Sequence, residues 1–325
     1  MHFKFINVVW GTSYTRLFID VSLPFSLSPN NLGSIPKNAD CEYCIYTTDV
    51  AGKRIRESSP FQQLQSLVRV RFLPLQMMTD HYKMMAVSHQ HALKNFSDGN
   101  TSLVFLCPDL IIADGSLKRL FSLVNEGKKA VMISGTRLSL ESLLPDLGTY
   151  LKAGGIISPR NLVREGLNHL HHQTCKMFWS NNAVYHFPAH VNWRVGTTGF
   201  ITHPFHIHPL LIVPQKGTMI TSTVDDDLFL KACIEPDEVK LITDSDDICV
   251  FEFSSDNQHD RIVLTNVDPV EYVANWAKAH TNSYHREYFR TAFKFHSEDL
   301  NDEWVKVEEA SSKIVNAILR GPEVK

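Results

Sequence analysis

The sequence lacks the long apolar and basic runs that mark membrane-spanning and nucleic-acid-binding proteins. No apolar run within its 325 residues approaches the roughly 18 to 20 residues that cross a bilayer. The net charge is -3 and no long basic run occurs, which argues against nucleic-acid binding by counterion release. The N-terminal residues MHFKFINVVW have no basic segment followed by a long apolar one, so we expect no secretory signal. We therefore expect a cytoplasmic protein, including one that works at the inner face of the membrane.

Several short motifs of well-known enzyme classes are also missing. Neither GxGxxG nor GxxxxGK[ST] occurs, so the standard dinucleotide and P-loop phosphate cradles are absent. There is no GxSxG nucleophile elbow and no HExxH zinc helix. The six cysteines are scattered, which favours reduced thiols. Cys41 and Cys44 form a CxxC without a second pair, and we interpret them as strand thiols rather than a zinc or redox motif.

What the sequence has is an ordinary globular composition, 43% apolar and 21% charged, with strands and helices alternating in the first half. Apolar patterning predicts strands at 3–10, 42–48, 68–75, 103–109 and 130–134, and helices at 14–24, 62–67, 80–96 and 116–126. This alternation predicts an α/β fold with a mostly parallel central sheet flanked by helices.

The second half is less regular. We expect helices at 139–147 and 159–171, an interrupted strand region at 191–213, strands at 239–242 and 248–253, and a largely helical tail at 269–319. We therefore expect a catalytic domain over 1–265 and a C-terminal helical extension over 266–325.

The stretch 103–115, LVFLCPDLIIADG, carries the first candidate site. Asp109 follows an apolar run that suits a strand buried on both faces. An acid at such a strand end lies at the mouth of an open α/β sheet, where it can hold a divalent cation and thereby phosphate oxygens. The alternative is that Asp109 only forms a turn. Asp114, before Gly115, is predicted to cap the next helix.

Three further groups of residues could carry chemistry. On an extended segment, His206 and His208 of PFHIHP point to the same side and could share a metal or an anion, or be a surface pair. Arg137 could face phosphate or simply be solvated. The third group is an acidic run, which could cap a helix or supply a catalytic base. Its members are Asp225, Asp226 and Asp227.

Two early segments, VVWGTSY at 8–14 and IYTTD at 45–49, resemble the beginning of bacterial-type nucleotide-sugar glycosyltransferases of the GT-A fold. In that family the first two strand ends hold the base and ribose, which assigns nucleotide contact to Trp10, Gly11, Thr47 and Asp49. VFLCPDLIIADG occupies the place of the family's acidic DXD motif, so Asp109 would bind metal and diphosphate, with Arg137 as a further contact. FHIHP and DDDLF would correspond to the metal histidine and the acceptor-side acid.

The resemblance implies transfer of a hexosyl or N-acetylhexosaminyl group from a nucleotide sugar to a glycan, lipid-linked or protein acceptor, as in polysaccharide biosynthesis. Mn²⁺ or Mg²⁺ would be the cofactor, with Asp109, His206 and His208 as ligands. An inverting enzyme would use an acid of 225–227 as base, and a retaining one would not need it there. The aromatic tail is compatible with a homo-oligomer. The alternatives are a metal-dependent hydrolase using His206 and His208, and a non-catalytic sugar- or nucleotide-binding module.

Overall fold

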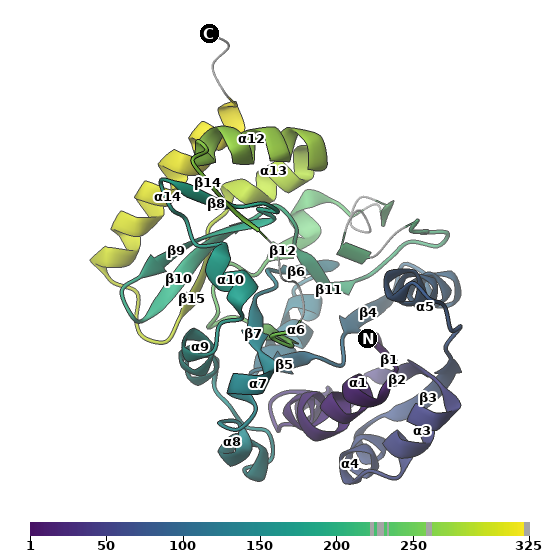
Figure 1. Ribbon diagram of the computed structural model, residues 1–325. Coiled ribbons are helices and arrows are strands. Elements are labelled where there is room, and N and C mark those ends of the chain that lie inside the picture. Colours follow the sequence, from purple (N-terminus) through teal and green to yellow (C-terminus); the bar gives the residue numbers. More distant parts are fainter. Residues whose placement is uncertain (222–223, 226–230, 233, 258–261, 322–325) are drawn as a thin grey trace. The chain divides into compact units, whose positions relative to one another are not determined.

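The computed structural model describes residues 1–221, 224–225, 231–232, 234–257 and 262–321. The chain forms two compact units, each assembled from three segments (Figure 1). The first contains Met1–Ile133, Gly148–Ser158 and His208–Ile242, and the second contains Ser134–Leu147, Pro159–Ile207 and Thr243–Lys325. The residues of the expected helical tail thus fall within the second unit. The domain boundary expected at residue 265 stays a prediction.

The first unit is built on a seven-stranded sheet of order β12-β6-β11-β4-β1-β2-β3. Its strands are β1 (His2–Val9), β2 (Asp40–Thr47), β3 (Arg69–Pro74), β4 (Thr101–Leu106), β6 (Ala130–Ile133), β11 (His208–Ile212) and β12 (Val239–Leu241). β11 runs antiparallel to its neighbours β4 and β6, whereas the other pairings, β1 with β2 and β4, β2 with β3, and β6 with β12, are parallel. The expected mostly parallel sheet flanked by helices is confirmed.

The centre of this sheet is apolar on both faces. All six residues of β4 are buried, as the apolar run before Pro108 predicts. β1 pairs with β4 on one side and with β2 on the other, and its residues from Phe5 to Val9 are all buried. The strands β1 and β4 are therefore held rigidly, and so are the chain segments that leave their carboxyl ends.

The helical segments of the first unit include a π-helical turn. They are α1 (Thr12–Leu17), the π-helix η1 (Phe18–Ser22), α2 (Leu23–Ser26), the 3-10 turns η2 (Leu32–Ser34) and η3 (Pro236–Glu238), α3 (Asp49–Arg56), α4 (Ser59–Leu67), α5 (His81–Phe96), α6 (Ser116–Asn125) and α8 (Gly148–Lys152). A short strand, β5 (Leu110–Ile112), precedes α6. The helix expected over 14–24 is confirmed as an unbroken helical stretch, but its residues Phe18–Ser22 are π-helical, and the Leu23 N–H bonds the Phe18 carbonyl.

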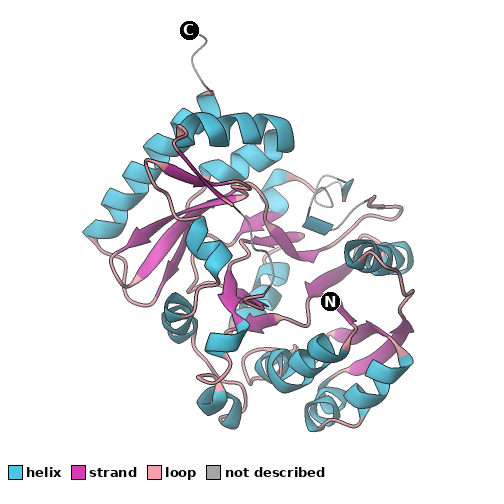
Figure 2. Cartoon of the chain, in the orientation of Figure 1, coloured by secondary structure: helices cyan, strands magenta, loops and turns pink. Residues whose placement is uncertain are grey.

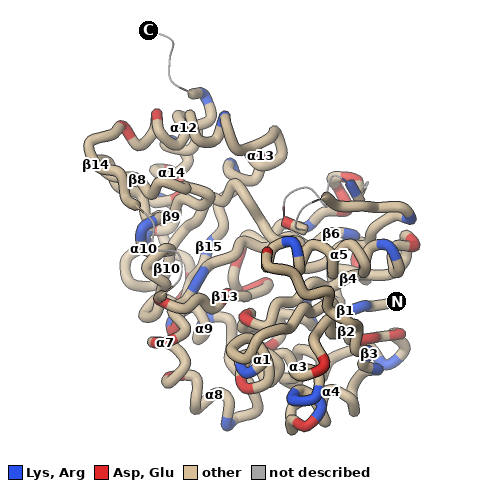
Figure 3. The backbone as a smooth tube through the Cα atoms, turned by 45° about the vertical axis from the view of Figure 1, so that its right-hand side comes forward, with Lys and Arg blue, Asp and Glu red and all other residues tan. Residues whose placement is uncertain are grey.

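Two other helices show what the sequence pattern captured and missed. Asp80 caps α5, because its carboxylate accepts hydrogen bonds from the backbone N–H groups of Tyr82 and Lys83, as predicted. Helix α3 was not predicted. Its last turn is basic, and Figure 3 shows Lys and Arg (blue) gathered around α3 and α4. The guanidinium of Arg56 lies 3.9 Å from the Phe72 ring centroid, a cation–π contact between α3 and β3.

A buried carboxylate ties the first three strands together. Glu42 on β2 has a side chain only 1% exposed, and it forms ion pairs with Lys4 at 2.9 Å, Arg71 at 2.9 Å and Arg69 at 3.1 Å. Burial alone would raise the pKa of Glu42, but the three cations outweigh it and hold that pKa below its usual range. Glu42 therefore stays ionised inside the sheet.

The strands of the second unit are short and belong to small sheets of two or three strands (Figure 2). β9 (His190–Val195), β10 (Gly199–Pro204) and β15 (Phe293–His296) form an antiparallel sheet with β10 in the middle. β7 (Arg137–Ser139) pairs parallel with β13 (Val250–Ser254), and β8 (Ala183–Tyr185) pairs antiparallel with β14 (Val263–Thr265). β15 interrupts the tail that we expected to be helical, because Phe293 and Phe295 are both buried along the edge of β10.

The helices of the second unit are α7 (Leu140–Leu143), α9 (Pro159–Asn168), α10 (His172–Lys176), α12 (Pro269–His280), α13 (Ser283–Arg290) and α14 (Asp302–Arg320). The tail helices supply much of its core: the Phe205 and Phe289 rings stack at 3.8 Å, and Trp304 packs against Val195 and Ile201. In the part of the chain that is described, no helix is both long and apolar enough to cross a membrane.

Candidate functional site

The order of strands in the first unit defines where a ligand would bind. From β1 the sheet grows through β2 and β3 on one side, whereas β4 lies on the other side of β1. The connections therefore change direction between β1 and β4. In open α/β sheets this switch point forms a crevice at the carboxyl ends of the strands. The segments that leave those two ends begin at Trp10 and at Cys107, and both belong to predicted site motifs.

Trp10 and Gly11 form the turn after β1. Gly11 has φ +72°, and a Cβ added there would have no atom within 4 Å, so the space beside this turn is open. Its carbonyl accepts hydrogen bonds from the backbone N–H and the hydroxyl of Thr15, which fixes the start of α1. The Trp10 ring lies 6.2 Å from Tyr14 and 6.0 Å from His81, measured between centroids. This aromatic group beside an open glycine turn is suited to stacking against a planar base.

The turn after β4 is fixed from within the unit. The hydroxyl of buried Ser22 donates a 2.5 Å hydrogen bond to the carbonyl of Pro108, and Leu110 N–H reaches the carbonyl of Cys107 at 3.3 Å. Asp109 stands between these two anchors and is half-buried. A half-buried carboxylate on a fixed turn at the switch point has the position expected of a phosphate- or metal-binding acid.

Asp114 does not cap α6, contrary to the sequence-based expectation. Its carboxylate accepts hydrogen bonds from the backbone N–H of Asn30 at 2.9 Å and from the Asn30 amide at 2.7 Å. The N-cap position is occupied by Gly115, and the Leu117 N–H is satisfied by Asn31 Oδ1 at 2.9 Å. A distant loop therefore supplies the capping group, which no local sequence pattern reveals.

The end of β2 carries the other nucleotide-binding candidates. Thr47 is buried, and its hydroxyl has no hydrogen-bond partner among the described residues. Thr48 caps α3 by accepting the Ala51 N–H at 3.3 Å, and Asp49 begins that helix and is exposed. The roles expected for Thr47 and Asp49 in holding a nucleotide stay predictions.

The structure brings together two residues that came from separate motifs. His208 opens β11, and because β11 is antiparallel its first residue lies at the carboxyl edge of β4 and β6. The His208 Nδ1 lies 2.5 Å from Asp225 Oδ1, and its Nε2 lies 3.5 Å from the carbonyl oxygen of Phe105. The imidazole is 19% exposed and the carboxylate 41% exposed. A carboxylate bound to one ring nitrogen orients the other, as in general-base and metal-ligating histidines.

Behind this pair lies a histidine that the sequence analysis missed. His89 of α5 is 2% exposed, its ring is 5.1 Å from that of Phe105, and neither ring nitrogen has a hydrogen-bond partner among the described residues. Burial lowers the pKa of His89 to about 4, although the negative charge of Asp225 acts in the opposite direction. His89 is therefore neutral at pH 7. Its place on the inner face of a helix made it indistinguishable from a core position.

The remaining predicted site residues are Asp226, Asp227, His206 and Arg137. Asp226 and Asp227 fall outside the described residues. His206 and Arg137 belong to the second unit. His206 occupies the bend between β10 and β11, so the premise that it shares one extended strand with His208 is wrong. Its ring contacts His285 at 4.3 Å, while Arg137 bonds Gln173 at 2.9 Å and Glu252 at 3.3 Å.

The described cysteines carry no signs of a metal or redox site. None of the five described cysteines forms a disulfide bond, and Cys41 and Cys44 both lie on β2. Burial raises the pKa of Cys41 to about 11 and that of Cys44 to about 12. The interpretation of this CxxC as strand thiols is confirmed.

Two groups of side chains among the described residues are close enough to share a metal ion, and both lie in the second unit. One contains Asp146, Glu165 and His169, and the other contains Asp244, Asp246 and His296. Neither includes Asp109, His206 or His208, so the metal-binding set expected from the sequence stays a prediction.

No family model matches the sequence, and no curated protein matches it. Among solved structures the chain is similar to a UDP-glucose pyrophosphorylase complexed with UDP-glucose, at 10% identity and a TM-score of 0.29, over 44% of this chain and 60% of that one. It is similar to TarS of S. aureus at 12% identity and a TM-score of 0.36, over 89% and 43%. A putative glucose-1-phosphate thymidylyltransferase from Bacillus anthracis, solved with sucrose, is similar at 11% identity and a TM-score of 0.27, over 41% and 55%. Each match spans less than two thirds of the other chain.

Proposed function

We propose that the chain is a glycosyltransferase of the GT-A type, which transfers a sugar from a nucleotide-sugar donor to a glycan, lipid-linked or protein acceptor. The observation that carries the proposal is the switch point between β1 and β4, which has Trp10–Gly11 at one strand end and Asp109 beyond the other. Ligands of open α/β sheets bind at this kind of place. The pairing of His208 with Asp225 at the same edge of the sheet adds a group able to do acid–base chemistry.

In this proposal the donor lies along the carboxyl edge of the sheet. Its nucleotide would contact the residues at the ends of β1 and β2, namely Trp10, Gly11, Thr47 and Asp49. Asp109 would hold Mn²⁺ or Mg²⁺ together with the donor diphosphate, because such ions are commonly bound by one or two carboxylates plus phosphate oxygens and water. The bound ion would stabilise the charge that develops on the departing diphosphate. Arg137 and His206 stay candidates for further contact with the diphosphate or metal.

Asp225 is the proposed base in an inverting transfer. A carboxylate would take the proton from the acceptor hydroxyl as that oxygen attacks the anomeric carbon and the diphosphate leaves. His208, bound to Oδ1 of Asp225, would hold the carboxylate in place. Asp226 and Asp227 remain alternative bases in the same acidic run.

A thermal-shift screen of UDP, GDP and CMP, with and without Mn²⁺, tests the proposal. A ligand that binds only the folded state at 100 times its Kd adds about 2.7 kcal/mol of stability, which is readily measured. We expect one nucleotide to stabilise the protein, more strongly with Mn²⁺, and Asp109→Ala to remove the Mn²⁺-dependent part. Asp20→Asn is the matched control, because it removes an exposed carboxylate of the same unit that forms an exposed i,i+4 ion pair with Arg16.

The alternatives give different results in the same screen. An unchanged nucleotide shift in Asp109→Ala would refute the role of Asp109. A shift with Zn²⁺ and with no nucleotide, together with ester hydrolysis, would support the metal-dependent hydrolase instead. Nucleotide binding without transfer of sugar to any acceptor class would support the non-catalytic module.

A further inference from the structure

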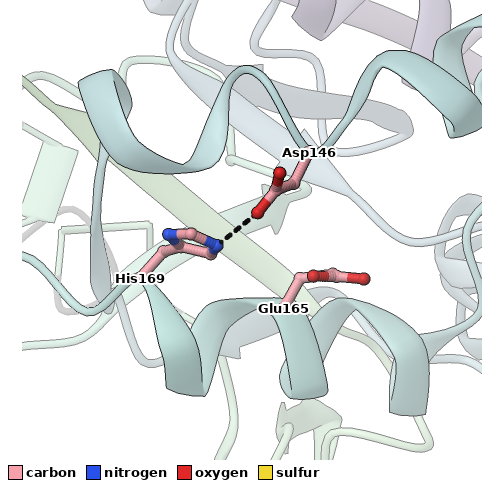
Figure 4. A group of neighbouring side chains, drawn as sticks. All are labelled: Asp146, Glu165 and His169. Carbon is pink, nitrogen blue, oxygen red and sulfur yellow. Dashed lines mark hydrogen bonds and ion pairs between the residues drawn. The ribbon is translucent and has the colours of Figure 1, made fainter.

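We propose that Asp146, Glu165 and His169 of the second unit form a binding site for a divalent transition-metal ion, with Zn²⁺ as the preferred ion. Each residue contributes one ligand atom, and the three atoms lie within 4.8 Å of one another. Figure 4 shows the Asp146 carboxylate and the His169 ring pointing toward each other, with Glu165 beside them on α9, the helix that ends just before His169. None of the three residues takes part in the proposed sugar transfer.

Two of the ligands are placed by the geometry of α9. Glu165 lies on α9, and His169 follows Asn168, the last residue of that helix, four residues after Glu165. The turn at the end of α9 therefore brings the two side chains close together. The His169 N–H continues the helix by donating to the Gly166 carbonyl at 3.1 Å, and the His169 carbonyl accepts the Ser139 N–H at 2.8 Å. The backbone that carries the imidazole is therefore held on both sides.

Asp146 reaches the same point from the turn after α7. Its N–H donates to the Leu143 carbonyl at 3.0 Å, and the turn is anchored by Leu143 and Leu147, which are fully buried. Asp146 Oδ2 lies 2.9 Å from His169 Nε2. Ligands from a fixed turn and a fixed helix thus converge without any rearrangement of the backbone.

The distance between Asp146 and His169 suits a small ion after side-chain rotation alone. Zn²⁺ holds nitrogen and oxygen ligands at about 2.0–2.2 Å, so two ligand atoms at the tetrahedral angle stand roughly 3.3 Å apart. The Asp146–His169 contact of 2.9 Å would open by a few tenths of an ångström. The Asp146 side chain is 56% exposed and can make this adjustment in solvent.

The Nδ1 atom of His169 has a hydrogen-bond partner that suits both the ion-free and the ion-bound site. His169 Nδ1 lies 3.0 Å from Ser142 Oγ, a hydroxyl that can both donate and accept. Without an ion, Nε2–H donates to Asp146 and Nδ1 accepts from Ser142. With an ion, Nε2 offers its lone pair and Nδ1–H donates to Ser142, which is the usual support of a metal-bound histidine.

The other candidate group is already neutralised by protein cations. Arg160 donates to both carboxylate oxygens of Asp246, and its guanidinium also pairs with Asp299 at 2.7 Å. His296 Nδ1 faces the Glu298 carbonyl at 2.7 Å, so it carries a proton, and Nε2 faces Asp244 at 2.8 Å. An added cation there would meet a guanidinium, which disfavours a metal ion in this second group.

The proposed ion would also be reachable by small molecules. A pocket of about 630 Å³ is lined by His169, Ser142, His172, Lys176 and Asp256, among others. Three protein ligands leave a tetrahedral ion one position for water or a small anion, and Lys176 in the lining favours an anion.

The test uses the full chain, dialysed against EDTA and titrated with ZnCl₂ in a calorimeter. We expect one saturable ion per chain beyond any bound elsewhere, at least tenfold weaker binding in Asp146→Asn and in Glu165→Gln, and loss of this ion in the double variant. Glu309→Gln, which removes an exposed carboxylate from α14 of the same unit, should bind as the unmodified chain does. Asp109→Ala should also keep this ion, which separates the site from the proposed sugar-transfer site.

A second measurement needs no variant. Zn²⁺ at one equivalent should protect His169 from modification by diethyl pyrocarbonate, read by peptide mass spectrometry, while exposed His280 reacts as before. Unchanged Zn²⁺ affinity in a folded double variant, or equal labelling of His169 with and without Zn²⁺, would overturn the proposal.

Discussion

His296 should make the stability of the second unit depend on pH in a defined direction. Its side chain is 3% exposed, Nε2 lies 2.8 Å from Asp244 Oδ1, and Nδ1 lies 2.7 Å from the Glu298 carbonyl. Burial alone would lower the pKa of His296, but hydrogen bonds to Asp244 and to Glu298 raise it above its usual 6.5. The bond from His296 in turn lowers the pKa of Asp244 below its usual 3.8, against an opposing effect of burial.

The sign of the effect follows from these directions. A base whose pKa is higher in the folded state contributes stability that is complete below its unfolded pKa and is lost as the pH rises through the folded pKa. The acid's contribution is present above its unfolded pKa and is lost as the pH falls. The pair therefore stabilises most between about pH 4 and pH 6.5.

The size of the effect can be estimated from the contacts. A hydrogen bond to a charged group contributes about 1.5–3 kcal/mol, and the solvent exposure of Asp244, 42% of its side chain, reduces this because exposed ion pairs are screened. We expect His296→Gln to lower the free energy of unfolding by about 1–2 kcal/mol at pH 5.5 and by clearly less at pH 9.

Urea unfolding of both proteins at the two pH values measures this difference. His280→Gln is the matched control, since it removes an exposed histidine of the same unit. If His296→Gln costs the same stability at pH 5.5 and at pH 9, the ion pair does not form and the reasoning is refuted.

The remaining predictions concern packing, charge and the candidate site. Gly199→Ala should cost about 3 kcal/mol in thermal unfolding, because its Cβ would lie 2.1 Å from the Phe295 carbonyl oxygen; an unchanged Tm would contradict this packing. Glu42→Ala should cost about 1–3 kcal/mol in urea unfolding, since it removes the buried carboxylate that pairs with Lys4, Arg69 and Arg71, and Asp20→Asn should cost little. His89→Leu should raise the free energy of unfolding at pH 5 by about 2 kcal/mol relative to its effect at pH 8. The pKa of the buried His89 imidazole is lowered to about 4, so this group destabilises the folded protein as the pH falls below 6.5. Equal effects of the substitution at both pH values would exclude this. Asp225→Asn should lower the rate of sugar transfer by about 10²-fold or more with nucleotide binding unchanged in the thermal-shift assay; loss of both would point to a structural role.

The core of the first unit could be predicted from local sequence patterns. The apolar run before Pro108 is β4, and Asp80 caps α5, because both features depend only on neighbouring residues. The π-helical turn at 18–22 and strand β15 could not be predicted in the same way. The first depends on how the chain continues past Pro24, and the second on an edge of β10 about ninety residues away in the sequence.

In the candidate site too, features set by neighbouring residues could be predicted, and features set by distant residues could not. Asp109 was singled out because it follows a buried strand, and His208 because it forms a pair with His206 at a spacing of two, and a one-dimensional pattern can reveal both features. The partnership of His208 with Asp225 arises only when β11 enters the sheet in reverse. Asp114 was wrongly assigned as a cap, because a loop over eighty residues earlier supplies other partners: Asn30 bonds Asp114, and Asn31 accepts the Leu117 N–H of α6. Interactions across such separations leave no periodic trace in the sequence.

The placement of β11 also dictates the order in which the protein can fold during synthesis. β4 and β6 are complete by residue 133, but the strand that lies between them begins only at His208. Until then the two halves of the sheet expose unpaired strand edges while the ribosome makes the first two segments of the second unit, Ser134–Leu147 and Pro159–Ile207. We therefore expect an N-terminal fragment ending near residue 158 to aggregate, and the complete chain to fold slowly because of these long-range pairings.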